Sequence, residues 1–182
     1  MKLIGIVGRK RNGKDTIADH LISNYNFEKY SFADPLKRGC MAMFGFTEEQ
    51  VFGSLKDEID PVWGCKPRDV LQVMGTELCQ YHIQDYIPSF KEIGRGIWLK
   101  RFEQFYKAND SKNIVLSDVR FIHEADLIMK LGGEVWKVVR PGTDIGDFHA
   151  SEKELDEVQF THLIENDSTL EDLYRKVDEL YR

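Results

Sequence analysis

The stretch LIGIVGRKRNGKDTIADHL, residues 3–21, decides the fold of this 182-residue chain. Its first five residues are apolar apart from one glycine, as in a buried parallel strand, and apolar residues later recur at a helical spacing. Between the two, Gly8, Gly13 and Lys14 have the spacing of a phosphate-binding loop, G-x-x-x-x-G-K. The glycines let backbone N–H groups turn toward phosphate oxygens, and the lysine reaches the terminal phosphates. We therefore predict a phosphate site between this strand and this helix.

The residue after the lysine departs from the usual motif. A hydroxyl that ligates Mg²⁺ is common there, whereas this chain has Asp15 and, one residue later, Thr16. A carboxylate at this place can hold a water of the Mg²⁺ shell, because this ion usually keeps several waters. Alternatively, Asp15 is an acid of the first helical turn, favoured by the helix dipole. The basic cluster 9–11 either lies beside the anion site or belongs in part to a solvated loop.

The composition is that of an ordinary globular chain, with 42% hydrophobic residues, 31% charged residues and a formal net charge of −6. Proteins that coat nucleic acids are usually basic, so we expect small phosphorylated partners and no nucleic-acid polymer. Cys40, Cys65 and Cys79 lack a C-x-x-C spacing and are expected to be free thiols. Without a signal-type start or an apolar run of roughly 20 residues, we expect a cytoplasmic protein with no membrane partner.

Apolar runs rich in β-formers alternate along the chain with amphipathic stretches. The predicted strands are 3–7, 28–34, 113–119, 134–139 and 161–166. The predicted helices are 14–25, one that begins near Pro35, 67–82, 97–107, 121–133 and one that follows Ser168. This alternation predicts an α/β fold in three layers, with a five-stranded parallel sheet flanked by helices. Residues 47–66 are mixed and turn-like, and we expect an irregular insertion there.

The last predicted helix carries a start signal. Ser168 and Glu171 stand three residues apart, which is the spacing of a capping box. Apolar residues follow at helical spacing, among them Leu173 and Val177. We therefore expect the Ser168 hydroxyl to cap the N-terminus of this helix.

Charged residues follow several predicted strands. In a parallel sheet, ligands bind beyond the carboxyl ends of the strands, so these residues are candidates for the chemistry. Asp118 ends a buried strand, where a carboxylate can help to hold Mg²⁺, and Arg120 can neutralise a transferring phosphoryl group. Alternatively, Asp118 caps the following helix and Arg120 is its ion-pair partner. Lys14, Arg68 and Arg140 are further cations that would complete a polyanion clamp.

Six segments occur in the same order as in one enzyme family: VGRKRNGKDTIADHL, PRDVLQVMGTELC, SDVRF, VVRPG, HASE and IENDSTLEDL. On these segments the chain resembles the bacteriophage deoxynucleoside monophosphate kinases over nearly its whole length, least in 44–66 and 84–96. The resemblance implies a single domain with the phosphate-binding-loop kinase fold. Its expected parts are a core (1–34 and 112–182), a helical acceptor-binding region (about 35–111) and a lid (about 140–155).

The same resemblance assigns roles to individual residues. ATP would be bound by Gly8, Arg11, Asn12, Gly13, Lys14, Asp15, Thr16, Arg140 and Asn166, with Asn166 near the adenine. The acceptor would be bound by Asp34, Lys37, Arg68, Gln72, Trp98, Asp118 and Arg120. The catalytic residues would be Lys14, Arg68, Asp118 and Arg120, and Mg²⁺ would be held by Asp15, Thr16 and Asp118, in part through water. Trp98 also has the helical spacing of a core residue, and that alternative stays open.

These features predict a kinase that uses ATP and Mg²⁺ to phosphorylate deoxynucleoside 5′-monophosphates, the deoxy preference being implied by the resemblance alone. A kinase of another small acceptor, of the dephospho-coenzyme A or phosphomevalonate type, would share the architecture. A nucleotide-binding switch without acceptor chemistry is a third alternative, against which stands the lack of an N-K-x-D guanine motif. The accepted bases and the oligomeric state, a homodimer included, stay open.

Overall fold

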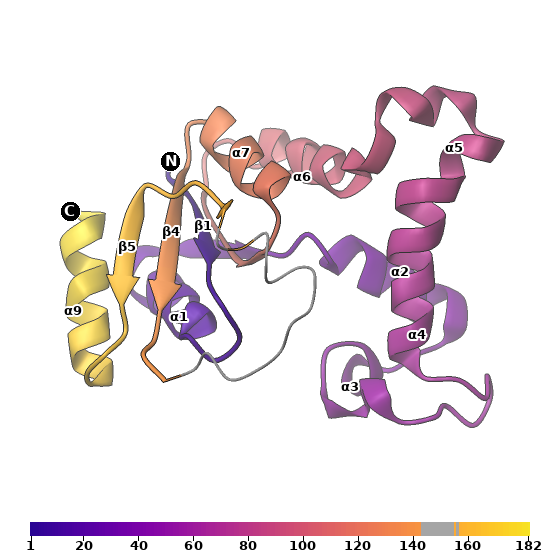
Figure 1. The fold of residues 1–182 in the computed structure, drawn as a ribbon, viewed down its shortest axis with the longest axis horizontal. Coiled ribbons are helices and arrows are strands. Elements are labelled where there is room, and N and C mark those ends of the chain that lie inside the picture. The colour runs from indigo at the N-terminus through magenta and orange to yellow at the C-terminus, as the bar shows by residue number, and fades with distance from the viewer. Residues whose placement is uncertain (143–154, 156) are drawn as a thin grey trace. The chain divides into compact units, whose positions relative to one another are not determined.

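The computed structural model describes residues 1–142, 155 and 157–182, and Figure 1 shows its ribbon. The chain forms two compact units. The sheet unit comprises Met1–Ser31 and Asn109–Arg182, and the helical unit comprises Phe32–Ala108. Along the chain, the helical unit is thus inserted between the second and third strands of the sheet unit.

A parallel sheet forms the centre of the sheet unit. In the described part of the chain its strands are β1 Leu3–Val7, β2 Phe27–Tyr30, β3 Asn113–Val119, β4 Glu134–Val139 and β5 His162–Glu165. Their order is β2-β3-β1-β4-β5. In the middle, Leu3 of β1 pairs with Ile114 of β3, and Ile4 pairs with Glu134 of β4. The predicted five-stranded parallel sheet is confirmed, and the carboxyl ends of β1, β3 and β4 lie side by side.

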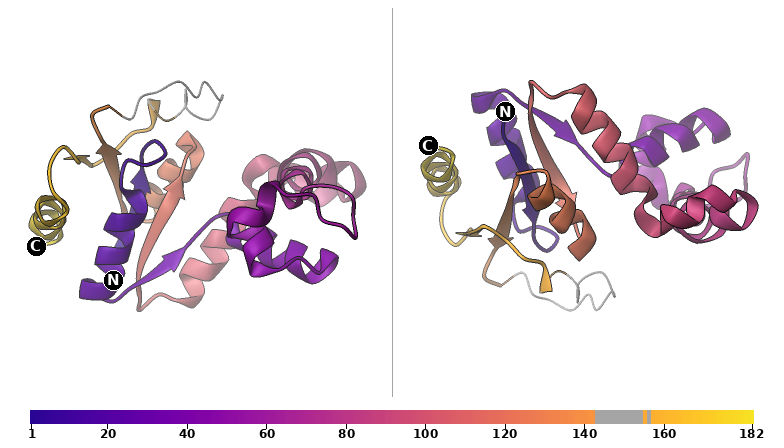
Figure 2. Two further views of the ribbon diagram at one scale, coloured as in Figure 1. Left: turned by 90° about the horizontal axis from the view of Figure 1, so that it is seen from below. Right: turned by 90° about the horizontal axis from the view of Figure 1, so that it is seen from above.

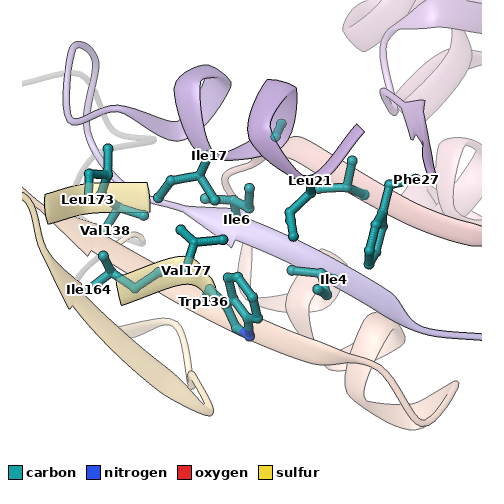
Figure 3. Close-up of a cluster of buried hydrophobic side chains, with 12 residues drawn as sticks. Ile4, Ile6, Ile17, Leu21, Phe27, Trp136, Val138, Ile164, Leu173 and Val177 are labelled. Atoms are coloured by element: carbon teal, nitrogen blue, oxygen red, sulfur yellow. The ribbon is translucent and has the colours of Figure 1, made fainter. Parts of the chain in front are cut away.

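Helices cover both faces of the sheet (Figure 2). They are α1 Lys14–Tyr25, α7 Ile122–Lys130 and α9 Leu170–Tyr181. Ile4 and Ile6 of β1 belong to a buried cluster with residues of α1 and α9, which Figure 3 shows. The residue between them faces the opposite layer, because a Cβ on Gly5 would lie 2.5 Å from Cδ1 of Ile128 on α7. Successive residues of β1 therefore pack alternately against the two helical layers.

The second strand is shorter than predicted. The sequence predicts 28–34, whereas β2 ends at Tyr30, opposite Leu116 of β3. Beyond that point the chain enters the helical unit, where the Phe32 ring packs edge-on against Phe102 at a centroid distance of 5.4 Å. Tyr30 and Phe32 are both buried, but in different units. The apolar alternation that predicted a long strand therefore continues across the boundary between the two units.

The helical unit consists of short helical segments. They are α2 Asp34–Phe44, α3 Glu48–Val51, η1 Ser54–Asp57, α4 Pro67–Gln72, η2 Val73–His82, α5 Ile83–Tyr86, η3 Pro88–Glu92, η4 Gly94–Gly96 and α6 Ile97–Ala108. Buried Cys40, Phe46 and Val51 form a small core, against which side chains of α2 and α4 pack. The expectation of an irregular stretch at 47–66 was wrong for its first part, since Thr47 caps α3 by accepting a hydrogen bond from the Gln50 N–H.

The helix predicted over 67–82 is present, but its second part, η2, is a π-helix. A Cβ on Gly75 would lie 2.4 Å from Cδ2 of Leu36 on α2, so a larger residue here would displace the end of the Leu36 side chain. The indole N–H of Trp98 donates to the Gly75 carbonyl at 3.1 Å. π-Segments within helices are rare and often occur at functional sites.

The start of α9 differs from its prediction by one residue. Thr169, and not Ser168, is the N-cap, and its hydroxyl accepts a hydrogen bond from the Asp172 N–H at 3.2 Å. Both Ser168 and Thr169 have an acidic residue three positions later, so the capping-box spacing fits either one equally well. Among the helices of the described residues, none has the length and apolarity needed to cross a membrane.

Candidate active site

The loop between β1 and α1 has the backbone shape that its glycines allow. A Cβ on Gly8 would lie 2.4 Å from the Val138 carbonyl oxygen of β4. Gly13 has a φ of 104°, and a Cβ there would lie 2.7 Å from Nδ2 of Asn166. Gly8 is thus required by its close approach to main-chain atoms of β4, and Gly13 by its backbone conformation. Arg11 adopts a left-handed conformation as well, with a φ of 68°.

Side-chain hydrogen bonds hold this loop against the sheet. Nδ2 of Asn12 donates to the Val138 carbonyl at 3.0 Å, and Nδ2 of Asn166 donates to the Asn12 carbonyl at 2.9 Å. Nζ of Lys14 donates to the Arg9 carbonyl at 2.9 Å. The loop is therefore connected both to β4 and to the residue that follows β5.

A cavity of about 310 Å³ opens at the N-terminus of α1. Its lining residues are Arg11, Gly13, Lys14, Asp15, Thr16, Arg140, Asn166, Ser168, Leu170 and Leu173. Most of the residues predicted to bind ATP are thus brought together in one place. The other two, Gly8 and Asn12, line a neighbouring cavity of about 430 Å³, which Arg140 also borders.

The cavity has a cationic part and an apolar part. Arg11, Lys14 and Arg140 contribute positive charge beside the N-terminal end of α1, where the helix dipole also favours anions. Leu170 and Leu173 of α9 form an apolar wall, and Leu170 is 49% exposed. An apolar wall beside a cationic helix end can receive a molecule that has both a flat ring and phosphate groups.

Asp15 is held by residues of the two neighbouring strands. Its Oδ1 accepts hydrogen bonds from Oγ of Ser117 at 2.8 Å and from Nζ of Lys29 at 3.0 Å. Burial raises the pKa of Asp15, but these bonds and the charges of Lys29 and Lys14 outweigh that effect and leave the pKa below its usual value. Asp15 is therefore an anion at neutral pH. The sequence analysis missed Lys29 and Ser117, although Ser117 directly precedes the predicted Asp118.

Asp118 and Arg120 lie at and beyond the end of β3. Oδ2 of Asp118 accepts a hydrogen bond from Oγ of Ser31 at 2.5 Å. The alternative in which Asp118 caps α7 is wrong, because Glu124 does so: its Oε2 accepts from the N–H groups of Arg120 at 2.8 Å and Phe121 at 3.2 Å. The loop that carries Arg120 is thus fixed by a carboxylate of α7.

Glu124 is unusual because it is a buried acid, only 8% exposed. Burial, and after it the charge of Asp118, raise the pKa of Glu124, whereas the two N–H donors and the charge of Arg120 lower it. The net result is a pKa of about 7. One sequence signal could have shown that Glu124 caps α7: it is a glutamate at the third position of the helix after the Arg120 loop.

The predicted acceptor residues, apart from Asp118 and Arg120, belong to the helical unit. Arg68 of α4 forms a two-pronged ion pair with Asp57, in which Nη2 lies 2.9 Å from Oδ2 and Nε contacts Oδ1. This pairing holds the pKa of the Asp57 carboxyl below its usual value. Gln72 is the last residue of α4, one helical turn after Arg68.

The remaining acceptor candidates lie on α2 and α6. Asp34 is the first residue of α2, and Lys37 on the next turn places its Nζ 4.7 Å from the ring centre of Phe52. α2 and α4 contact each other, which brings Asp34, Lys37 and Arg68 onto neighbouring helices. Trp98 of α6 uses its indole N–H for the bond to Gly75, so packing against η2 is one role that it has.

The predicted lid lies mostly outside the described residues. Only Arg140 to Gly142 and Leu155 of the range 140–155 are described, and Arg140 borders both cavities. In the described part of the chain, no three His, Cys, Asp or Glu side chains gather closely enough to form a metal cluster. Cys40, Cys65 and Cys79 are free thiols, as expected.

Comparison with solved structures establishes the fold. A dephospho-CoA kinase from Campylobacter jejuni matches with a TM-score of 0.50 and 16% identity, over 100% of this chain and 96% of its own. A Thermus thermophilus protein matches with a TM-score of 0.51 and 15% identity, over 99% and 96% of the two chains. At such identities the likeness concerns the fold alone, and it confirms the predicted phosphate-binding-loop kinase architecture.

Comparison with sequences establishes the family. A protein of Acanthamoeba polyphaga mimivirus, whose name places it among the deoxynucleotide monophosphate kinases, is 38% identical over 97% of this chain and 94% of its own length. The deoxynucleotide monophosphate kinases of Escherichia phage RB69 and Enterobacteria phage T4 are 26% and 25% identical, over 100% of both chains and 97% of both chains respectively. A family model described as deoxynucleotide monophosphate kinase matches residues 2–60 and 58–177. The chain belongs to the deoxynucleotide monophosphate kinase family.

Proposed function

We propose that this protein transfers the γ-phosphoryl group of ATP to the 5′-phosphate of deoxynucleoside monophosphates. The observation that carries the proposal is the cavity at the N-terminus of α1, where Arg11, Lys14 and Arg140 gather beside an apolar wall. Cations and a helix end suit the phosphates of a nucleotide, and the leucines of α9 suit its base. Membership of the family favours a deoxynucleotide as acceptor.

The reaction needs charge and alignment more than it needs a base. An oxygen of the acceptor phosphate attacks the γ-phosphorus, the bond from that phosphorus to the β,γ-bridging oxygen breaks, and ADP leaves with the electron pair. Because the attacking oxygen is already anionic, no strong base has to remove a proton. Lys14 and Arg120 are the residues that we expect to offset the charge of the transferring group.

Mg²⁺ would neutralise phosphate charge when bound, and the residues present fit this ion. The Asp15 carboxylate, an anion at neutral pH, and Thr16 both line the cavity. Such a small set of protein oxygens suits Mg²⁺, which usually keeps several waters and binds through one or two carboxylates and substrate phosphates. Asp118 is our third candidate, acting through water from the end of β3.

The helical unit is the part that we expect to bind the acceptor. Arg68 is a bidentate donor on α4, and a guanidinium of this kind suits the planar recognition of a phosphate. Lys37 and Gln72 lie on neighbouring helices of the same unit. Asp57 holds the Arg68 guanidinium in one orientation through its two carboxylate oxygens.

A coupled assay that follows ADP formation tests the proposal. The acceptors are the four common deoxynucleoside 5′-monophosphates, their ribose counterparts and dephospho-coenzyme A, each with ATP and Mg²⁺. We expect turnover with at least one deoxynucleotide and none with dephospho-coenzyme A. A Lys14→Met variant that keeps its circular dichroism spectrum but loses turnover would locate the reaction at this loop. ADP formation that requires no acceptor, or no turnover with any nucleotide, would overturn the proposal.

A further inference from the structure

We propose that Asn12 and Asn166 are positioning residues, whose two side-chain amides hold the phosphate-binding loop in shape by linking it to the ends of β4 and β5. This inference rests on the proposed function, since the loop it concerns is the one that would bind ATP. It differs from the role implied by family resemblance, in which Asn166 lies near the adenine.

Asn12 is directed into the protein, toward β4. The residue is only 3% exposed, and its Nδ2 donates a hydrogen bond to the Val138 carbonyl of β4. Gly8, at the start of the same loop, approaches that carbonyl so closely that a Cβ would lie 2.4 Å from its oxygen. Both ends of the loop are thus fixed against one peptide group of β4.

Asn166 supplies the second link. Its backbone N–H donates to the Val139 carbonyl at 2.8 Å, which extends the pairing of β5 with β4 by one residue. Its Nδ2 donates to the Asn12 carbonyl at 2.9 Å. Because a carbonyl only accepts hydrogen bonds, the NH₂ group of Asn166 has to face the loop, and it lies where a Cβ on Gly13 would be 2.7 Å away.

The two amides act in series around one residue. β4 accepts from the Asn12 side chain, and the Asn12 main chain accepts from Asn166. The preceding residue, Arg11, has a φ of 68°, a conformation that a side chain larger than glycine adopts only when its surroundings impose it. The links to Asn12 provide that constraint directly beside it.

A loop held in this way keeps its shape before a ligand arrives. Binding then avoids the entropy cost of ordering the loop. Loss of either amide should weaken binding of any polyphosphate, whatever its base. A residue that contacts the adenine would instead affect only ligands that carry a base.

This difference defines the experiment. Isothermal titration measures the dissociation constants of Mg–ATP and of Mg–tripolyphosphate, which has no base, for the full-length protein and its Asn12→Ala and Asn166→Ala variants. We expect each variant to bind both ligands about tenfold more weakly, as for the loss of one buried hydrogen bond. Asn24→Ala is the matched control, because Asn24 is an exposed asparagine of α1 whose amide bonds to His20, four residues earlier in the same helix.

The double variant gives a second readout. If the amides act in series, Asn12→Ala combined with Asn166→Ala should bind little more weakly than either single variant. Should Asn166→Ala fail to fold by circular dichroism, Asn166→Ser and the Asn12→Ala variant carry the same expectation for tripolyphosphate. Weaker binding of ATP with unchanged binding of tripolyphosphate would assign Asn166 to the base and overturn the proposal, as would unchanged binding of both. Failure of the unmodified protein to bind either ligand would count against the proposed function instead.

Discussion

Asp15 shows what a residue's neighbours along the chain cannot reveal. The sequence analysis left two roles open for Asp15, contact with the water shell of Mg²⁺ and interaction with the helix dipole. Both roles follow from its position after Lys14 alone, so the sequence could not decide between them. Its hydrogen-bond partners lie 14 and 102 residues away, on β2 and β3. Pairing between strands creates these contacts, so local spacing could not predict them. Asp15 thus also fastens the start of α1 to the sheet, beside its cavity-lining position.

The loop glycines were predictable, whereas the buried acid behind Arg120 was not. Gly8 and Gly13 belong to a motif whose spacing follows directly from how a backbone encloses phosphate. Glu124 has no such pattern, and its environment arises from the packing of α7 on the sheet. Its raised pKa nevertheless predicts how the stability of the protein depends on pH.

Replacing Glu124 by glutamine should change how stability depends on pH. The pKa of Glu124 rises from 4.5 to about 7 on folding, so between these values the folded protein keeps a proton that the unfolded chain has released. Stability therefore falls as pH rises through this window. Glu124→Gln keeps an acceptor for the N–H groups of Arg120 and Phe121 but carries no charge. Relative to the unmodified protein, it should gain up to about 3 kcal/mol between pH 4.5 and pH 7.5.

Urea unfolding at pH 5 and pH 8 measures this difference. Subtracting the two proteins at each pH removes the contribution of all other carboxylates. Equal differences at the two pH values would show that Glu124 titrates normally in the folded state.

The boundaries of helices and strands were predicted correctly where a local sequence pattern marks them. The predictions were wrong where two residues satisfy the same pattern. The limits of β1, α1, β3 and β4 agree with the sequence analysis, because apolar runs and glycines mark them. The cap of α9 was misassigned by one residue, since Ser168 and Thr169 satisfy the same spacing rule. The π-geometry of η2 was not predicted, because no spacing within η2 indicates it, and its contacts at Gly75 with Leu36 and Trp98 come from other helices.

The start of α9 can be tested by a matched pair of variants. Thr169→Ala removes the hydroxyl that accepts from the Asp172 N–H and should lower the free energy of unfolding by about 1 kcal/mol. Ser168→Ala removes a neighbouring hydroxyl that does not cap the helix and should change it by less than about 0.5 kcal/mol. Urea unfolding of both variants gives the comparison. A larger loss of unfolding free energy for Ser168→Ala would show that Ser168 is the cap, as the sequence pattern predicts.

The division into two units separates the predicted binding residues. The cavity at α1 lies in the sheet unit, whereas Asp34, Lys37, Arg68, Gln72 and Trp98 all lie in the helical unit. Alternation of strands and helices predicted the sheet unit. The helical unit has few periodic segments longer than three turns, and its arrangement depends on close approaches such as that of Gly75 to Leu36. Its internal packing could therefore not be derived from the sequence.

Arg68→Met should affect the acceptor and leave ATP binding unchanged. Arg68 belongs to the helical unit and does not line the cavity that we assign to ATP, and our proposal assigns it to the acceptor phosphate. We expect kcat/KM for the deoxynucleotide to fall by an amount equivalent to about 2–4 kcal/mol. Titration with ATP alone should give an unchanged dissociation constant.

Lys91→Met is the control for charge, because Lys91 is an exposed lysine of the same unit. It should leave both constants unchanged. Weaker ATP binding by Arg68→Met would show that Arg68 acts on the donor nucleotide, and unchanged kcat/KM would remove it from the acceptor site.

The strand order also determines when the protein can acquire its fold during synthesis. β1 is translated well before its two partners, which begin only at Asn113 and Glu134. The whole helical unit, Phe32–Ala108, is translated before the first of them appears. Pairing between segments so far apart in sequence has to wait until both exist. The phosphate-binding loop is thus translated long before β4 and Asn166, the parts of the chain to which it is hydrogen-bonded, and it can take its final shape only after both have been made.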